Sequence, residues 1–319
     1  MNNNFFEVLR PGINTTFQDK GRFDMQHMGV APSGCMDHKS FLIANALVSN
    51  EEKEGVIEFA YQGPLLKLVK GKIKFAITGN VLFQIINSKN ETINGECNRS
   101  YNLDEGDQID ILATRQSAYG YLAVEGGFDV TPFCNSVSTL ARAEIGPNEG
   151  KKIDIKNEIP LKKNRKDKQN YKVNVLLEKN NVIRVLKGPQ FDYFSDVSQK
   201  EFFSKDYSIT NLTDRMGMRL EGKVLKNNVS TNIRSEGITK GAIQVPEDGQ
   251  PIVLLTDHPT IGGYPKIANV ISADYDLLVQ KIPGTNISFK CIDLREAEHL
   301  YKDWCSNISK IIKDIKKIK

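Results

Sequence analysis

The chain alternates between short apolar runs and glycine-rich or polar turns, a pattern typical of β-strands. The first half contains VIEFAYQG, KIKFAITG and YGYLAVEGG, and the second contains VIRVLKGPQ, PIVLLTDH and NISFKCID. These runs often alternate with period two and end at turn residues. The pattern predicts a mainly β protein with two β-rich halves of similar length, which indicates an internal duplication.

Two segments have the apolar spacing of helices instead. A first helix is expected at about 37–48, with Asp37 as its N-cap and Phe41 on its apolar face. An amphipathic C-terminal helix is expected at about 295–318. Its apolar stripe comprises Trp304, Ile308, Ile311, Ile315 and Ile318. Because lysines line the opposite face, we expect the stripe to pack on the protein body or a partner rather than on a membrane surface.

A basic segment separates the two halves. In KKIDIKNEIPLKKNRKDKQNYK, residues 151–172, nine of 22 residues are Lys or Arg. Charge runs of this kind are usually exposed linkers, and phosphate binding is the less favoured interpretation. The sequence therefore predicts an N-terminal domain at 1–150, a basic linker at 151–172, and a second domain at 173–319 that ends in the C-terminal helix.

Composition restricts the class of protein. Hydrophobic residues make up 39% of the chain and charged residues 26%, and the net charge is only +4, which argues against a nucleic-acid binder. The sequence shows no signal-peptide pattern and no run of 18 apolar residues, so a cytoplasmic protein without a membrane span is expected. The five cysteines lack any Cys-x-x-Cys pair, which fits reduced thiols rather than a zinc site.

The common catalytic and cofactor motifs are missing from the sequence. It has no phosphate-binding Gly-x-x-x-x-Gly-Lys-Ser/Thr, no dinucleotide-binding glycine fingerprint, no Gly-x-Ser-x-Gly elbow and no His-Glu-x-x-His. The four histidines have no metal-ligand spacing, and there is no Met-Lys-Met of the kind that carries covalent biotin. We therefore expect no metal site and no covalent biotin in this chain.

Four polar, glycine-rich loops stand out from this background. They are FQDKGRFDMQHMGVAPSGCMD at 17–37, TDRMGMRLEGK at 213–223, IRSEGITKGAIQVPEDGQP at 233–251 and TDHPTIGGYPKIANVISADYDLLVQ at 256–280. Each loop alone is best interpreted as turn chemistry with surface ion pairs. Together they favour a ligand site, because glycine lets a backbone approach a ligand closely and arginine offers paired donors to a carboxylate or phosphate.

The candidate site residues come from both halves of the chain. The candidate bases, or groups that orient water or a cation, are Asp19, Asp37 and Asp257. The candidate substrate-binding residues are Gln18, Arg22, Arg215, Arg219, Gln244, Gly262, Gly263 and Tyr264. Ligand sites are often built where two domains meet, so we expect these residues to line one groove between the domains.

The same loops, taken in order, resemble those of the family of 5-oxoprolinase C subunits. This family is also called allophanate hydrolase subunit 2 or biotin-dependent carboxyltransferase-like, and it includes Kip-type antagonists. The resemblance covers nearly the whole chain and includes LRPGINTTFQDKGR, GVAPSGCMD, YLAVEGGFDV, DRMGMRLEG and IGGYPKIANVISADYDLLVQKIPG. It implies two tandem cyclophilin-like β-barrel domains with a few short helices. The chain departs from the family pattern at Cys35, Lys151 and His258-Pro259, changes that bear on the substrate rather than on the fold.

The resemblance also implies a function and partners. The chain would be the C subunit of an ATP-dependent 5-oxoprolinase, which opens the lactam of 5-oxo-L-proline to L-glutamate. It would act with a Kip inhibitor-like B subunit and with an A subunit, share ATP with them, and have little activity alone. One alternative is a biotin-dependent carboxyltransferase subunit that acts on a urea-like substrate, although no biotin carrier segment lies in this chain. The other is a non-enzymatic Kip-type regulator that binds a kinase-inhibitor partner.

Overall fold

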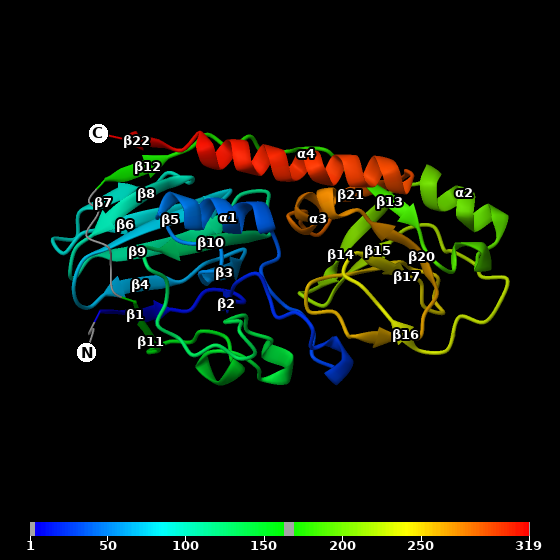
Figure 1. The fold of residues 1–319 in the computed structure, drawn as a ribbon, viewed down its shortest axis with the longest axis horizontal. Helices are drawn as coiled ribbons and strands as arrows, with labels where there is room; N and C mark the ends of the chain where they lie inside the picture. Colours follow the sequence, from blue (N-terminus) through cyan, green and yellow to red (C-terminus); the bar gives the residue numbers. More distant parts are fainter. Residues whose placement is uncertain (1–3, 163–168, 319) are drawn as a thin grey trace. The chain divides into compact units, whose positions relative to one another are not determined.

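The computed structural model describes residues 4–162 and 169–318, which form two compact units (Figure 1). The first unit takes in 1–22, 33–176 and 307–319, and the second takes in 23–32 and 177–306. Each unit is therefore discontinuous in sequence. Within the expected linker, residues 158–160 and 170–172 form strands of the first unit, while residues 163–168 lie outside the described residues.

Two antiparallel sheets make up the first unit. The six-stranded sheet has the order β11 (Glu158–Pro160), β1 (Phe5–Arg10), β4 (Leu65–Leu68), β9 (Gln108–Thr114), β6 (Val81–Ile86) and β7 (Thr92–Asn94). The seven-stranded sheet has the order β2 (Thr16–Gln18), β3 (Val56–Ala60), β10 (Tyr119–Val124), β5 (Ile73–Gly79), β8 (Arg99–Leu103), β12 (Asn170–Lys172) and β22 (Lys316–Ile318). Both sheets contribute side chains to one apolar core.

This core explains the period-two pattern of the sequence. Phe6 and Leu66 come from the six-stranded sheet, Phe59 and Phe75 come from the seven-stranded sheet, and all four are fully buried. Successive residues of a strand point to opposite faces, so alternating apolar residues place their side chains on the same face. Burying one such side chain contributes roughly 1.5–3 kcal/mol, which makes this core the main stabilising element of the unit.

The first predicted helix is confirmed. α1 (His38–Leu47) belongs to the first unit and contacts β5 and β10. Its N-cap is Asp37, whose carboxylate accepts a hydrogen bond from the backbone N of Ser40 at 2.9 Å. The cap satisfies a backbone donor that has no partner within the helix, and Phe41 and Leu47 are buried. Short 3₁₀ helices also occur, among them η1 (Gln26–Met28) in the second unit, and η2 (Ala141–Ala143) and η3 (Asn148–Gly150) in the first.

The second unit is built on a closed seven-stranded barrel. The strands follow the order β13 (Val182–Lys187), β20 (Lys266–Val270), β17 (Ala242–Gln244), β18 (Ile252–Leu254), β15 (Gly217–Glu221), β14 (Tyr207–Thr213) and β21 (Asn286–Cys291). β13 and β21 pair in parallel, and the other neighbours are antiparallel. A separate two-stranded ribbon joins β16 (Glu236–Gly237) to β19 (Ile261–Gly262). The unit also contains η4 (Phe191–Tyr193), α2 (Asp196–Ser204) and α3 (Ser272–Val279).

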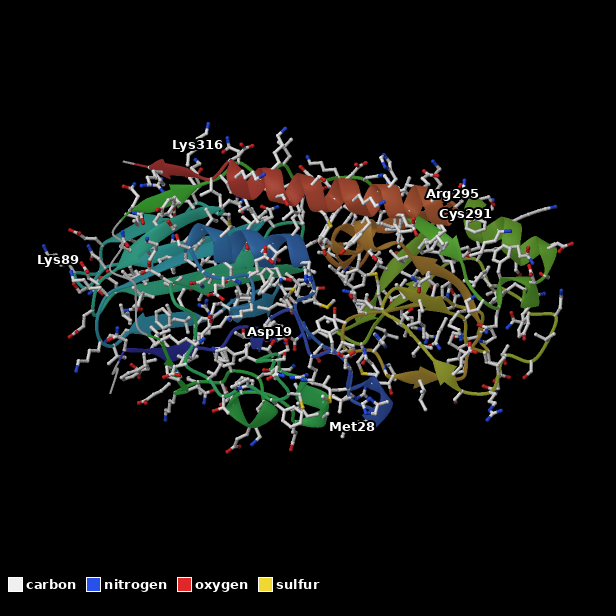
Figure 2. All side chains as sticks on the ribbon, in the orientation of Figure 1. Asp19, Met28, Lys89, Cys291, Arg295 and Lys316 are labelled. Carbon is white, nitrogen blue, oxygen red and sulfur yellow. The ribbon has the colours of Figure 1, made fainter. Side chains whose placement is uncertain are left out.

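The C-terminal helix begins where it was expected and ends earlier. α4 spans Leu294–Lys313, and Figure 2 labels Arg295 near its start and Lys316 in the strand that follows it. Ile308 is buried on the helix, but Ile318 lies in β22, so the expectation of a helix to residue 318 is wrong at its end. The cause is the antiparallel pairing of β22 with β12, which gives the backbone N–H and C=O groups of residues 316–318 partners in a sheet.

The expected fold class is confirmed. Within the part of the chain that the structure describes, strands dominate, one unit closes into a barrel, and only four α-helices occur, the last of them amphipathic. No helix among these residues combines the length and the apolar character that a bilayer span requires.

Candidate functional site

Asp19 is held by hydrogen bonds in the first unit. Its carboxylate accepts from Ser136 Oγ (2.7 Å), Ser138 Oγ (2.6 Å), the backbone N of Val137 (2.7 Å) and the backbone N of Gly21 (2.8 Å). A carboxylate has about four acceptor directions, so these contacts occupy the group. Asp19 therefore ties the loop after β2 to residues 136–138, and it would have to break these contacts to act as a base.

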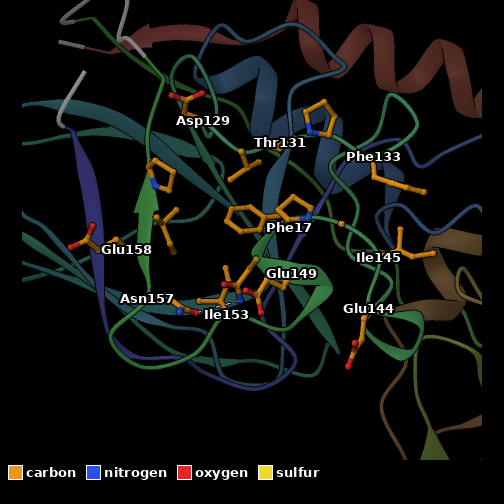
Figure 3. A pocket seen from close by; sticks show the side chains of 17 residues that line it. Phe17, Asp129, Thr131, Phe133, Glu144, Ile145, Glu149, Ile153, Asn157 and Glu158 are labelled. Atoms are coloured by element: carbon orange, nitrogen blue, oxygen red, sulfur yellow. Dashed lines mark hydrogen bonds between the residues drawn. The ribbon is translucent and has the colours of Figure 1, made fainter. Parts of the chain in front are cut away.

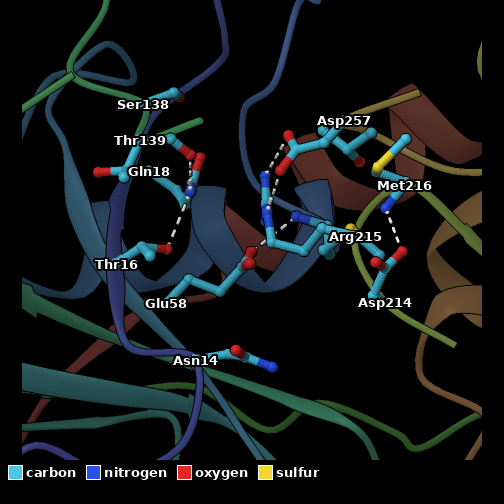
Figure 4. A network of polar contacts seen from close by, with 12 residues as sticks. Asn14, Thr16, Gln18, Glu58, Ser138, Thr139, Asp214, Arg215, Met216 and Asp257 are labelled. Carbon is cyan, nitrogen blue, oxygen red and sulfur yellow. Dashed lines mark hydrogen bonds and ion pairs between the residues drawn. The ribbon is translucent and has the colours of Figure 1, made fainter. Parts of the chain in front are cut away.

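Gln18 and Arg22 contact the same segment. Gln18 Nε2 donates to Thr16 Oγ1 at 2.9 Å and to the carbonyl of Thr139 at 3.0 Å (Figure 4). Gln18 Oε1 is buried and has no hydrogen-bond partner among the described residues. Arg22 donates to the carbonyl of Ser138, and its guanidinium lies 6.0 Å from the centre of the Phe133 ring. Gln18, Asp19 and Arg22 thus contact one segment of the first unit, residues 136–139.

Asp37 acts as a helix cap beside a buried tyrosine. Its two carboxylate oxygens accept from the backbone N and the Oγ of Ser40, at 2.9 and 2.7 Å. Its backbone N donates to Tyr121 Oη at 2.7 Å. Burial raises the pKa of Tyr121 well above its usual value, and the nearby Glu58 and Asp37 carboxylates add to the shift. Tyr121 therefore stays protonated at neutral pH, and the contacts of Asp37 fit a structural role.

The arginines at 215 and 219 have different environments in the second unit. Arg215 forms a two-point ion pair with Asp257, with Nε–Oδ2 at 2.8 Å and Nη2–Oδ1 at 3.0 Å, and the side chains are 12% and 8% exposed (Figure 4). Arg219 pairs with Asp248, and those side chains are 32% and 45% exposed. Arg215 and Asp257 therefore form a buried pair, whereas Arg219 lies in a surface pair.

The remaining predicted residues lie around the β16–β19 ribbon. A Cβ on Gly262 would lie 2.6 Å from Gln244 Nε2, so only glycine permits this approach. A Cβ on Gly263 would lie 3.1 Å from the carbonyl oxygen of Ile233. Tyr264 is partly exposed. The glycine pair predicted to allow close approach thus accommodates the side chain of Gln244 and the backbone of residue 233.

Sequence analysis missed three residues of this cluster. Lys266 Nζ lies 2.5 Å from Glu236 Oε1, and Gln190 Nε2 donates to the same oxygen at 2.8 Å. Gln190 Oε1 accepts from the backbone N of Lys266 at 3.2 Å. A signal was present, because Lys266 opens the apolar run KIANV, and lysine is almost never buried in a strand without an acidic partner.

A cavity of about 730 Å³ lies in the first unit (Figure 3). Its apolar lining includes Phe17 and Ile153, and its rim includes the carboxylates Glu144, Glu149 and Glu158. None of the predicted site residues lines it. Such a rim suits a cationic or neutral ligand better than an anion.

The predicted residues divide between the two units. Gln18, Asp19, Arg22 and Asp37 belong to the first unit, and the other candidates belong to the second. The shared groove therefore stays a prediction. In the part of the chain that the structure describes, no three His, Cys, Asp or Glu side chains are grouped as metal ligands would be.

This chain is similar in sequence to known proteins that are components of enzymes. The family described as "Carboxyltransferase domain, subdomain A and B" matches residues 28–291. The chain is 33% identical over 291 residues to the C subunit of Escherichia coli 5-oxoprolinase, covering 91% of this chain and 92% of that protein. It is 31% identical over 294 residues to the C subunit of Haemophilus influenzae 5-oxoprolinase, covering 92% of this chain and 93% of that one.

Larger proteins contain a similar region. Urea amidolyase of Saccharomyces cerevisiae is 28% identical over 308 residues, which is 89% of this chain but 16% of that protein. The crystal structure of K. lactis urea amidolyase superposes with a TM-score of 0.87 at 26% identity, covering 96% of this chain and 20% of that one. The present chain thus spans about a fifth of that structure's chain.

Proposed function

The chain belongs to the carboxyltransferase-domain family of subdomains A and B, and from this membership we propose that it is the C subunit of an ATP-dependent 5-oxoprolinase. One observation carries the proposal: the similarity to the C subunit of E. coli 5-oxoprolinase extends over 92% of that protein. The urea amidolyase of S. cerevisiae has only 16% of its length in common with this chain. The proposed reaction opens the lactam of 5-oxo-L-proline to L-glutamate.

The chemistry of a lactam explains why such an enzyme needs hydrogen-bond donors. Nitrogen donates electron density into the carbonyl, so water attacks it slowly. Phosphorylation of the carbonyl oxygen by ATP creates a good leaving group, and the negative charge that develops needs donors already in place. In the second unit, Arg215 offers such donors, because its guanidinium is fixed in position by Asp257.

The proposal includes partners and a shared nucleotide. A Kip inhibitor-like B subunit and an A subunit would complete the enzyme, and ATP would be bound together with them in the cytoplasm. This chain would carry no covalent biotin. Its sequence has no nucleotide-binding motif, so the isolated chain is expected to have little or no turnover.

The proposal is tested by reconstitution. The chain is purified with its B and A partners and assayed for glutamate and phosphate released from 5-oxo-L-proline and ATP. We expect turnover with all three proteins and little when any one is omitted. Full turnover by the isolated chain, or no glutamate from the complete complex, would contradict the proposal.

A second candidate function follows from the likeness to urea amidolyase. The superposition with a TM-score of 0.87 over 96% of this chain favours a carboxyltransferase that acts on a urea-like substrate. Such a carboxyltransferase would need a biotin carrier supplied by another chain. Carboxylation of urea by this chain with a biotinylated carrier, and no glutamate from 5-oxo-L-proline, would favour this function over the first.

A further inference from the structure

A buried lysine lies beneath the β16–β19 ribbon of the second unit. Lys266 opens β20, and its side chain is only 5% exposed. A charged group is tolerated in such a position where a counter-charge contacts it. Glu236 of the ribbon supplies that charge, with its Oε1 at 2.5 Å from Lys266 Nζ. The carbonyl of Tyr264 lies 3.4 Å from the same nitrogen.

The two partners of this ion pair differ in their freedom to move. The Glu236 side chain is 43% exposed and sits on a two-stranded ribbon outside the barrel sheet, whereas Lys266 is part of the barrel. The hydrogen bond from Lys266, and secondarily that from Gln190, lowers the pKa of Glu236, so it is a carboxylate at neutral pH. Glu236 can therefore turn toward solvent when another anion takes its place beside Lys266, while Lys266 cannot follow it.

A second donor lies next to this pair. Gln244 is opposite Lys266 across the β17–β20 ladder, and opposed residues have neighbouring side chains. Gln244 is 6% exposed, and its Nε2 has no hydrogen-bond partner among the described residues. An unpaired buried donor is costly, and a ligand oxygen would remove that cost.

Gly262 joins the two observations. It pairs with Glu236 in the ribbon, and a Cβ at this position would meet Gln244 Nε2 at 2.6 Å. Gln244 Nε2 thus lies next to Gly262, the residue that pairs with Glu236 across the ribbon. Lys266 thus contacts Glu236 and is paired in register with Gln244, so an ammonium and an amide are close neighbours in this part of the barrel.

We propose that Lys266 and Gln244 bind the carboxylate of a small ligand, and that Glu236 occupies this position until the ligand carboxylate replaces it. The ammonium and the amide N–H match the two oxygens of a carboxylate. The inference rests on the proposed function for the identity of the ligand, 5-oxo-L-proline. It goes beyond that function by assigning the carboxylate-binding group and an internal competitor for it.

The test measures binding to the isolated full chain by calorimetry. The probes are 5-oxo-L-proline and 2-pyrrolidinone, which has the same lactam ring without the carboxylate. Glu236→Gln removes the competing charge, so we expect about fivefold tighter binding of 5-oxo-L-proline and no change for 2-pyrrolidinone. Lys266→Met is expected to weaken binding of 5-oxo-L-proline at least fivefold. The matched control is Glu201→Gln, which breaks another partly exposed pair, with Lys223 at 3.5 Å in the same unit, and leaves binding unchanged.

A further variant tests the amide. Gly262→Ala places a methyl group against Gln244 Nε2 while the backbone keeps an ordinary conformation, so binding of 5-oxo-L-proline should weaken without a loss of fold. Circular dichroism and the melting temperature check the fold of each variant. Equal affinities of Glu236→Gln and Glu201→Gln, including no binding by either, would overturn the inference, as would an equal gain for 2-pyrrolidinone.

The same variants in the reconstituted complex separate this inference from the proposed function. Carboxylate binding that depends on residue 236, in a complex that releases no glutamate, would reject the ATP-dependent reaction and retain the carboxylate site. Turnover with an unchanged KM for 5-oxo-L-proline in Glu236→Gln would reject the carboxylate site and retain the reaction.

Discussion

Replacing Arg215 and replacing Arg219 should have very different effects on stability, although both changes remove a guanidinium from the same short segment. Arg215→Ala leaves Asp257, which is 8% exposed, without the two donors at 2.8 and 3.0 Å. Removing one partner of a buried pair typically costs about 3–5 kcal/mol, because the remaining charge is buried without compensation. Arg219→Ala breaks a pair whose members are 32% and 45% exposed, and such pairs contribute less than about 1 kcal/mol.

The assay is urea and thermal unfolding of the isolated chain, followed by circular dichroism. For a unit of this size, 1 kcal/mol moves the melting temperature by roughly 2–4 °C. Arg215→Ala should therefore lower the transition of the second unit by roughly 6–20 °C, and Arg219→Ala by less than about 4 °C. Arg215→Lys keeps the charge but loses the paired donors, so its stability should fall between that of the wild type and that of Arg215→Ala.

The outcome that would refute this reasoning is a stability change below about 1 kcal/mol in both alanine variants. Should Arg215→Ala keep its melting temperature while turnover of the complex disappears, Arg215 clamps an anionic group of the substrate instead. Equal activity of both variants and the wild type would reject the clamp.

Two more predictions concern buried ionisable groups. Lys74 and Glu125 in the first unit are 0% and 1% exposed, with Nζ and Oε1 3.8 Å apart. Lys74→Met or Glu125→Gln alone should therefore lower the free energy of unfolding by about 3–5 kcal/mol, whereas the double variant Lys74→Met, Glu125→Leu should lose much less. Additive losses of the two changes in urea unfolding would contradict this. Burial lowers the pKa of His258, so the unfolded chain takes up a proton first as the pH falls. The free energy of unfolding of the wild type, measured relative to that of His258→Asn, should therefore decrease below about pH 6.5, by at most ~1.4 kcal/mol per pH unit. The exposed His299→Asn is the control, and parallel pH profiles of the wild type and His258→Asn would count against the prediction.

The fold class could be predicted from local patterns, because many strands and the first helix carry their own signal. Asp37 preceding an apolar run indicated a cap, and the structure has it there. The end of the C-terminal helix could not be predicted in this way. Ile318 continues the apolar spacing of that helix, but pairing with a strand about 150 residues earlier in the sequence takes precedence.

The contacts within the candidate site could not be predicted, since composition shows which loops are polar but not which side chains meet. Asp19 and Asp37 have the residue type of a base, yet their hydrogen bonds are used in holding loops and a helix end. The pairing of Arg215 with Asp257 joins residues 42 positions apart, and no local pattern indicates it. Lys266 was missed because its acidic partner, Glu236, lies in a different loop of the sequence.

The discontinuous first unit has a consequence for biosynthesis. Its seven-stranded sheet ends at β22 (Lys316–Ile318), which follows the second unit in the sequence, whereas β2 of the same sheet precedes that unit. The second unit, mostly 177–306, is translated between them. The first unit to be started is therefore completed only after the second unit has been translated, and β12 keeps an open edge until β22 is synthesised. A disruptive substitution in β22 would therefore perturb the N-terminal unit rather than the barrel that precedes this strand in the sequence.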